Sequence, residues 1–372
     1  MAHKALGVIN SAPNYIRVEG LHDYRPIGAF SFLGRFRVID FPISNMSNSG
    51  LDKIHVYLNS RPRSIVEHIG SGRHYNINSK RGSLQMMFTQ NNGASSIYNT
   101  DINAYMENIE QIERTPRDYV VIAPSYMVYK QDFQQLLDFH VSTGTDITIM
   151  YHKVDQAKDY YRGCNILNLN KQKGVSSIER NMGTAKEKNI SMDTYVMSKE
   201  LFLYLIKRAR NESSAYSFAD MLNIACNDMD VRGYLHKGYF AAITSLDDYY
   251  RANIELLDYS TANELFRPGW QIYTRTTDAC PSKYVSGSSV KNSMICNGSI
   301  IEGRVENSII GRNVHIGQGA VIKDSIILSY ADIAEGVRIE RAVVDKWAEI
   351  KKLKTIASNG VTPTYVKRND IL

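Results

Sequence analysis

The C-terminal third of the chain carries an aliphatic repeat with a period of six residues. The aliphatic positions form two series, Ile310, Ile316, Ile322 and Leu328, and Val321, Ile327, Ile333 and Ile339. Small or turn-forming residues lie between them, at Gly311, Asn313, Gly317, Gly319 and Gly336. Helices and flat sheets have shorter periods, whereas each side of a triangular β-helix takes about six residues. The pattern therefore predicts a left-handed parallel β-helix of hexapeptide repeats, with a C-terminal tail, over residues 266–372. So short a β-helix leaves faces open, and we expect it to pack against another domain or subunit.

Residues 1–265 show a different pattern, in which short apolar strands alternate with longer amphipathic segments. The predicted strands are Ala5–Ile9, Lys53–Leu58, Tyr119–Ala123, Asp146–Tyr151, Asp193–Met197 and Gly238–Ile243. The predicted helices are Asp132–Gly144, Ser198–Asn211 and Leu246–Asp258, the second beginning at a serine N-cap. Alternation of this kind favours an α/β domain with a mostly parallel sheet, of the Rossmann-like class.

Composition and charge exclude several classes of protein. Hydrophobic residues make up 43% and charged residues 22% of the 372 residues, which is typical of a soluble globular chain. No apolar run is long enough to cross a membrane, and the N-terminus lacks a secretory signal. The net charge of +6 is modest for this length, so we expect no nucleic-acid partner. The four cysteines are scattered, which fits a cytoplasmic protein.

An α/β domain followed by hexapeptide repeats allows two kinds of enzyme. A hexapeptide acyltransferase would use a histidine base in the β-helix, where His315 is the candidate. A lone histidine in such a repeat is more often an outward surface residue, and this hypothesis leaves the large first domain unexplained. The other possibility is nucleotidyl transfer in the α/β domain.

Several segments favour the second possibility. The stretch "GRFRVIDFPISNMSNSGLDKIHVYLNSRPRSIVEHIGSG" (Gly34–Gly72) resembles a signature of bacterial glucose-1-phosphate adenylyltransferase, also called ADP-glucose pyrophosphorylase. So do "VYKQDFQQLLDFHVSTGTDIT", "LDDYYRANIELL" and "CPSKYV", in the same order along nearly the whole chain. The resemblance implies a family that makes ADP-glucose from ATP and glucose-1-phosphate, needs magnesium and responds to anionic effectors.

The resemblance fails at the positions that carry the chemistry. Where the family has a glycine-rich phosphate loop, this chain has Asn10–Tyr15, which contains a proline and no glycine. Ile27 stands at the position of a phosphate-binding lysine. Ser125 and Ala242 stand at the positions of two aspartates that hold magnesium, and Ala241 replaces an arginine. These losses predict no catalytic residues, no metal site and no bound cofactor in this chain.

Other substrate positions are altered rather than lost. By the resemblance, Glu179 and Arg180 match the glutamate and lysine at the family's sugar-phosphate site, so we interpret them as a remnant of that site. Asp193 and Asn99 match two of the family's glycines.

A chain that keeps the scaffold and lacks the catalytic groups is similar to the regulatory D-type subunits of this family. That resemblance implies a regulatory role in a heterotetramer with a catalytic subunit, which would hold the magnesium. It also implies an anion site between the domains, for a sugar-phosphate effector, with Arg25, Arg35 and Arg37 as candidates. A weakly active adenylyltransferase with a rearranged site is the alternative.

Overall fold

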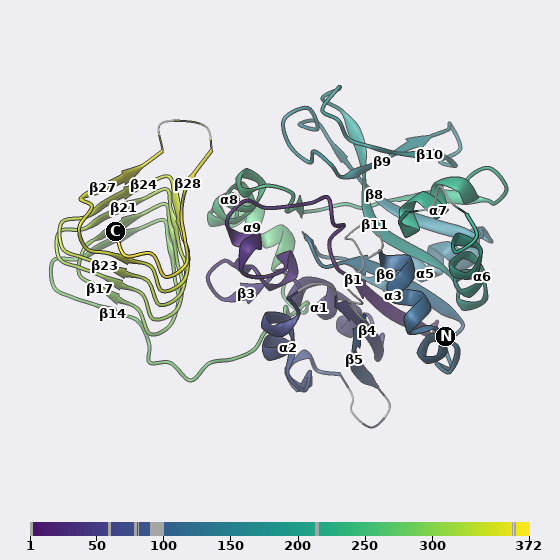
Figure 1. The fold of residues 1–372 in the computed structure, drawn as a ribbon, viewed down its shortest axis with the longest axis horizontal. Helices are drawn as coiled ribbons and strands as arrows, with labels where there is room; N and C mark the ends of the chain where they lie inside the picture. Colours follow the sequence, from purple (N-terminus) through teal and green to yellow (C-terminus); the bar gives the residue numbers. More distant parts are fainter. Residues whose placement is uncertain are drawn as a thin grey trace.

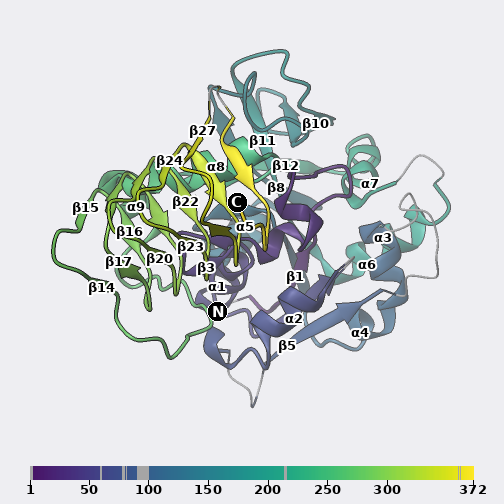
Figure 2. The same cartoon turned by 60° about the vertical axis from the view of Figure 1, so that its left-hand side comes forward.

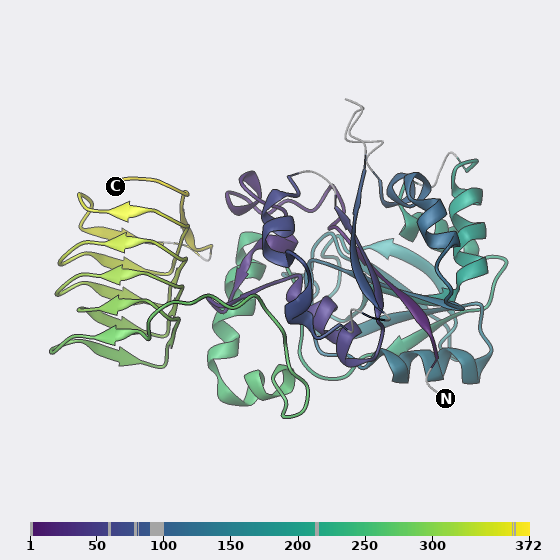
Figure 3. The ribbon, with the colours of Figure 1, turned by 90° about the horizontal axis from the view of Figure 1, so that it is seen from below.

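A computed structural model describes residues 3–58, 61–77, 80, 82–89, 100–212, 216–358, 360 and 362–372. It places an α/β domain beside a three-sided stack of β-coils (Figures 1 and 3). None of the helices in these residues is both long and apolar enough to cross a bilayer. The boundary after residue 265 stays a prediction.

The α/β domain is built on a mixed sheet with parallel strands at its centre, which confirms the predicted class. The main-sheet strands are β1 (Ala5–Asn10), β4 (Lys53–Leu58), β5 (Ser83–Phe88), β6 (Tyr119–Pro124), β8 (Ile147–Val154), β9 (Asn165–Leu169), β10 (Val175–Arg180), β11 (Lys188–Ser198) and β12 (Val231–Leu235). Their order is β10-β9-β11-β6-β1-β4-β5; outside this path, β8 pairs with β11 and β12 pairs with β8. Strands β6, β1, β4 and β5 run parallel, and β11 runs antiparallel to β6.

Helices cover both faces of this sheet (Figures 1 and 2). They are α1 (Asp40–Asn48), α2 (Arg63–Ile69), α3 (Asp101–Glu107), α4 (Ile109–Glu113), α5 (Phe133–Thr143), α6 (Lys199–Ala209), α7 (Phe218–Ala225), α8 (Leu246–Ile254) and α9 (Tyr259–Leu265). The 3₁₀ turns are Leu21–Asp23, Ile27–Ala29, Arg73–Tyr75 and Glu255–Leu257. Alternate side chains of β1 enter two separate cores, with Ile9 in one and Val8 in the other. The Ser198 hydroxyl accepts a hydrogen bond from the Leu201 amide, which confirms the predicted N-cap.

One predicted strand lies outside the main sheet. The segment Gly238–Ile243 contributes β13 (Phe240–Ala242), which pairs with β7 (Met127–Tyr129) in a small separate sheet. A second small sheet pairs β2 (Ser31–Phe32) with β3 (Phe36–Arg37). A periodicity of two shows that a segment is extended and does not reveal its partner.

The hexapeptide repeat forms the predicted β-helix of three five-stranded parallel sheets. The first sheet contains β14 (Lys283–Tyr284), β17 (Ile300–Ile301), β20 (His315–Ile316), β23 (Asp332–Ile333) and β26 (Glu349–Ile350). The second contains β15 (Ser289–Lys291), β18 (Arg304–Glu306), β21 (Val321–Lys323), β24 (Arg338–Glu340) and β27 (Thr355–Ala357). The third contains β16 (Met294–Ile295), β19 (Ile309–Ile310), β22 (Ile326–Ile327), β25 (Ala342–Val344) and β28 (Thr364–Val366).

Two members of the predicted inward series do not belong to the interior of the β-helix. Val321 is half-buried beside the inward Ile322, and Leu328 belongs to the core of the α/β domain. Register partners such as His315 and Asp332 are 17 residues apart, one short of three hexapeptides. Each such coil is therefore one residue shorter than three repeats of six. A position predicted from a strict period of six shifts by one residue per coil, and a shift of one residue along a strand turns the side chain from the inner face to the outer face.

The third sheet packs on the α/β domain. Its inward side chains, such as Ile310 and Ile327, fill the β-helix, whereas Ile309, Ile326 and Val343 join the main core. We call this contact, made by Ile309, Ile326 and Val343, the apolar seam. Between the same two domains, the Arg25 guanidinium pairs with the Asp345 carboxylate, and both side chains are almost fully buried. The Tyr365 hydroxyl donates to the same carboxylate at 2.7 Å.

This seam gives a first prediction. Asp345→Ala should lower the free energy of unfolding by about 3–5 kcal/mol, because it leaves the Arg25 charge buried without its partner. Urea unfolding followed by tryptophan fluorescence measures the change. Glu113→Ala is the control, since its ion pair with Lys207 is exposed and should contribute less than about 1 kcal/mol. Equal losses in the two variants would contradict the prediction.

Candidate functional site

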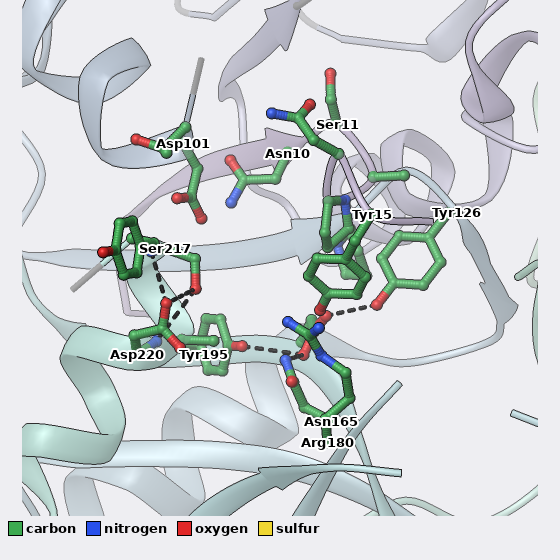
Figure 4. Close-up of a pocket in the computed structure, with 18 residues that line it drawn as sticks. Asn10, Ser11, Tyr15, Asp101, Tyr126, Asn165, Arg180, Tyr195, Ser217 and Asp220 are labelled. Carbon is green, nitrogen blue, oxygen red and sulfur yellow. Dashed lines mark hydrogen bonds between the residues drawn. The ribbon is translucent and has the colours of Figure 1, made fainter. Parts of the chain in front are cut away.

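A cavity of about 430 Å³ opens where β1 and β6 end, at Asn10 and Pro124 (Figure 4). The carboxyl ends of parallel strands are the usual position of ligand sites in α/β sheets. Residues Asn10–Tyr15, α3, α7, β10 and β11 supply most of the wall. The structure therefore preserves a cavity at the place where nucleotidyl transfer would occur.

The loop after β1 lines this cavity with side chains. The Ser11 hydroxyl donates to the Tyr57 carbonyl at 3.0 Å, and the Ile16 amide closes a turn on the Pro13 carbonyl at 2.9 Å. Proline has no N–H to offer a phosphate, and side chains occupy the space that glycines would leave open. The loop is thus unsuited to holding a triphosphate.

Tyr15 covers Arg180, the one arginine among the described residues that line this cavity. The Cζ atom of Arg180 lies 3.7 Å from the centre of the Tyr15 ring, which is a close cation–π contact. Burial, with the nearby Asp193, raises the pKa of Tyr15 well above its usual value, so its hydroxyl stays protonated. Within the described residues, the Arg180 guanidinium has no hydrogen-bond acceptor, which leaves its N–H groups available to the cavity.

Glu179 lies away from Arg180. Its Oε1 atom accepts a hydrogen bond from the Asn168 amide at 2.7 Å and one from the Ser177 hydroxyl at 3.3 Å. Successive side chains of a strand point to opposite faces, so β10 sends only Arg180 into the cavity. The structure therefore separates the two residues that the sequence pattern grouped as a sugar-phosphate remnant.

Asp193 is the best-connected polar side chain in the cavity wall. Its carboxylate accepts hydrogen bonds from the Tyr126 hydroxyl at 2.5 Å, the Asn165 amide at 3.0 Å and the Tyr195 hydroxyl at 3.1 Å. Burial raises the pKa of Asp193, and these donors partly offset that rise. Asp193 sits at a break in the β11–β8 register with φ near +43°, a conformation that suits the glycine it replaces in the resemblance.

Two further carboxylates, Asp101 and Asp220, lie at helix N-termini. Asp101 Oδ1 accepts from the amides of Ile102 and Phe218 at 2.9 and 3.0 Å. Asp220 Oδ2 accepts from the Ser217 amide and hydroxyl, both at 2.8 Å, in a capping box. Sequence reasoning missed both residues, although the Ser-x-x-Asp spacing of Ser217 and Asp220 is a recognisable helix start.

The residues at the positions matched to phosphate and metal ligands are buried, and all but Ser125 are apolar. Ile27 is buried in a 3₁₀ turn. Ser125 is buried and donates its amide to the Asn10 carbonyl at 2.8 Å. Ala241 and Ala242 are buried in β13. These residues do not fit a magnesium ion, and no group of three or more His, Cys, Asp or Glu side chains in the described part of the chain could hold a metal. Asn99 lies outside the described residues.

A second pocket, of about 530 Å³, lies between the two domains and is strongly basic. Arg25, Arg35 and Arg37 all line it, so the structure brings the three candidate effector residues together. Sequence reasoning missed the other cationic residues of the wall, which are Arg275, Arg312, Lys346 and Arg368. They come from the connecting segment and the β-helix, where no local pattern marks them.

The candidate arginines differ in how far they are already engaged. Arg25 is committed to Asp345, and Arg37 Nη1 donates to the Ala29 carbonyl at 2.5 Å. Arg35 is exposed at the rim. Burial, reinforced by the charge of Arg25, lowers the pKa of Arg37 to about 10; burial, reinforced by the charges of Arg37 and Arg25, lowers the pKa of Lys346 well below its usual value. A bound anion would relieve this crowding of positive charge.

His315, the acyltransferase candidate, lies on β20 and is half-exposed. Its Nδ1 atom is 2.8 Å from Asp332 Oδ1, and its Nε2 atom is 3.8 Å from Glu302 Oε1. These surface contacts account for the histidine without a catalytic role.

The buried carboxylate of Asp101 in the first cavity leads to a prediction about how the stability of the protein depends on pH. Burial, together with Asp220 and Asp193, raises the pKa of Asp101 to about 6. Because the folded state holds this proton more tightly than the unfolded chain, Asp101 makes the protein lose stability as pH rises from about 4 to 6. Asp101→Asn should therefore gain stability relative to wild type over this range, measured by urea unfolding at each pH. If the difference in unfolding free energy between Asp101→Asn and wild type did not change with pH, the raised pKa of Asp101 would be contradicted.

Comparisons with known proteins agree with this geometry. A family model described as nucleotidyl transferase matches residues 17–259, and one described as the GlmU-like C-terminal hexapeptide matches residues 280–362. The chain is 31% identical over 323 residues to the glycogen biosynthesis protein GlgD of Geobacillus stearothermophilus, covering 87% of this chain and 84% of that protein.

Two other relatives span similar lengths. The glucose-1-phosphate adenylyltransferase of Clostridium perfringens is 30% identical over 308 residues, covering 81% of this chain and 77% of that protein. The GlgD protein of Bacillus subtilis is 27% identical over 368 residues, covering 98% and 96%. The chain therefore belongs to the nucleotidyl transferase family, in the group that contains GlgD proteins and glucose-1-phosphate adenylyltransferases.

Proposed function

We propose that this chain is a regulatory, catalytically silent subunit of glucose-1-phosphate adenylyltransferase in glycogen biosynthesis. It would join a catalytic subunit in a cytoplasmic heterotetramer and modulate the formation of ADP-glucose from ATP and glucose-1-phosphate. The names of its relatives, glycogen biosynthesis protein GlgD and glucose-1-phosphate adenylyltransferase, support this pathway.

One observation carries the proposal. The cavity at the end of β1 and β6 keeps its place, yet Ile27, Ser125 and Ala242 stand where a lysine and two metal ligands are needed. Phosphoryl chemistry depends on cations that neutralise charge in the transition state, and loss of one such donor typically costs about 3–4 kcal/mol. We infer that magnesium acts in the partner subunit.

The basic pocket supports a role in regulation. It is lined by residues of both domains, including Arg37 and Lys346, so a bound sugar phosphate would contact both. Exposed apolar side chains on the first two coils, Tyr284 at 53% and Ile300 at 40% exposure, offer a surface for the partner subunit.

Mixing experiments test the proposal. ADP-glucose formation is measured for this chain alone, for its catalytic partner alone and for the mixture. We expect no rate from this chain and a changed rate or substrate affinity on mixing. A magnesium-dependent rate from this chain alone would favour the alternative, an adenylyltransferase with a rearranged site. No change on mixing would contradict a regulatory role.

The effector site gives a further prediction. Arg35→Gln removes an exposed charge from the basic pocket, so the sugar-phosphate concentration that gives half of the response should rise about tenfold. Titration of the mixed enzyme with inorganic phosphate and a sugar bisphosphate measures this. Arg232→Gln is the control, because Arg232 is a surface arginine paired with Asp230. Equal responses of the two variants would place the effector elsewhere.

A further inference from the structure

We propose that the cavity at the end of β1 and β6 binds a small uncharged saccharide instead of a nucleotide or a sugar phosphate. This goes beyond the proposed function, because regulation through the basic pocket needs no ligand here. The inference rests on the charge, the hydrogen-bonding groups and the aromatic surface of the cavity.

The charges in the wall oppose a phosphorylated ligand. Three carboxylates, those of Asp101, Asp193 and Asp220, line the cavity, with Arg180 as the one cationic side chain among its described lining residues. A triphosphate or sugar phosphate would bring two or more negative charges close to these three carboxylates, and like charges repel at short range. Figure 4 shows Asp101 and Asp220 on one side and Arg180 on the other.

The hydrogen-bonding groups are complementary to hydroxyls. The bonds of Asp101 to backbone amides use its Oδ1 atom, and those of Asp220 to Ser217 use its Oδ2 atom. Among the described residues no donor contacts the second oxygen of either carboxylate, so each can accept from a ligand, while Arg180 donates from the opposite side. A hydroxyl both donates and accepts. A saccharide satisfies both sides, whereas an ammonium ion suits only the carboxylates and a phosphate only the arginine.

Tyrosine rings supply the apolar surface that a sugar ring needs. Tyr15, Tyr126, Tyr195 and Tyr216 all line the cavity; Tyr15 and Tyr216 are exposed and present ring surface to it, whereas Tyr126 and Tyr195 are almost fully buried in its wall. The hydroxyls of Tyr126 and Tyr195 are held by Asp193, which fixes both rings. The cavity volume of about 430 Å³ is within the range of small-ligand sites.

Calorimetry and saturation-transfer NMR with the full chain alone test the proposal. The ligands are glucose, maltose, glucose-1-phosphate, ATP with magnesium, and putrescine as a simple cation. We expect saturable binding of glucose or maltose that is tighter than that of the other three. Tighter binding of a phosphorylated ligand or of putrescine, or no binding of either saccharide, would overturn the proposal. Because no partner subunit is present, the result is independent of the regulatory test.

Variants locate the binding site. Asp101→Asn and Asp220→Asn keep an oxygen for their backbone contacts and lose the charge, so each should weaken saccharide binding about tenfold. Asp138→Asn, on the exposed surface of α5, should bind as wild type does. Circular dichroism confirms folding of each variant. Equal affinities of all three variants would show that the saccharide binds elsewhere and would overturn the assignment.

Discussion

The molecule depends on the apolar seam between the β-helix and the α/β domain. A coil made of two- and three-residue strands has an outer face as well as an inner one, and one of its three outer faces carries Ile309, Ile326 and Val343. Burial of these side chains in the main core removes apolar surface from water and fixes the β-helix in place. The Arg25–Asp345 pair at the same seam fixes its orientation.

That seam also creates the basic pocket. Arg25, Arg35 and Arg37 belong to the first domain, whereas Lys346 and Arg368 belong to the last coils of the β-helix. Bringing so many cations together is unfavourable by itself, and burial together with the neighbouring arginines lowers the pKa values of Arg37 and Lys346. The packing energy of the seam holds them there, which gives the pocket its strongly basic character.

The two pockets have opposite electrostatic character. The cavity at the end of β1 is lined by carboxylates and tyrosines, and the interdomain pocket by arginines. In the first cavity, the Asp193 carboxylate accepts hydrogen bonds from Tyr126, Asn165 and Tyr195. Asp193 stands at a position matched to a glycine, which could not form this network. The scaffold of a nucleotidyl transferase is retained, while the groups that such chemistry needs are absent from the positions matched to them.

Sequence by itself determined the β-helix and the α/β class, because both depend on local periodicity, and it predicted the loss of the phosphate and metal ligands from the residue type at each matched position. It also proposed Arg25, Arg35 and Arg37 as effector residues, and the structure places all three in the wall of one pocket. Only the tertiary structure decided that Val321 and Leu328 leave the β-helix interior, that Glu179 and Arg180 separate, and that Asp101, Asp193 and Asp220 converge. These outcomes depend on coil length, strand alternation and contacts between residues far apart in the chain, none of which a local pattern records.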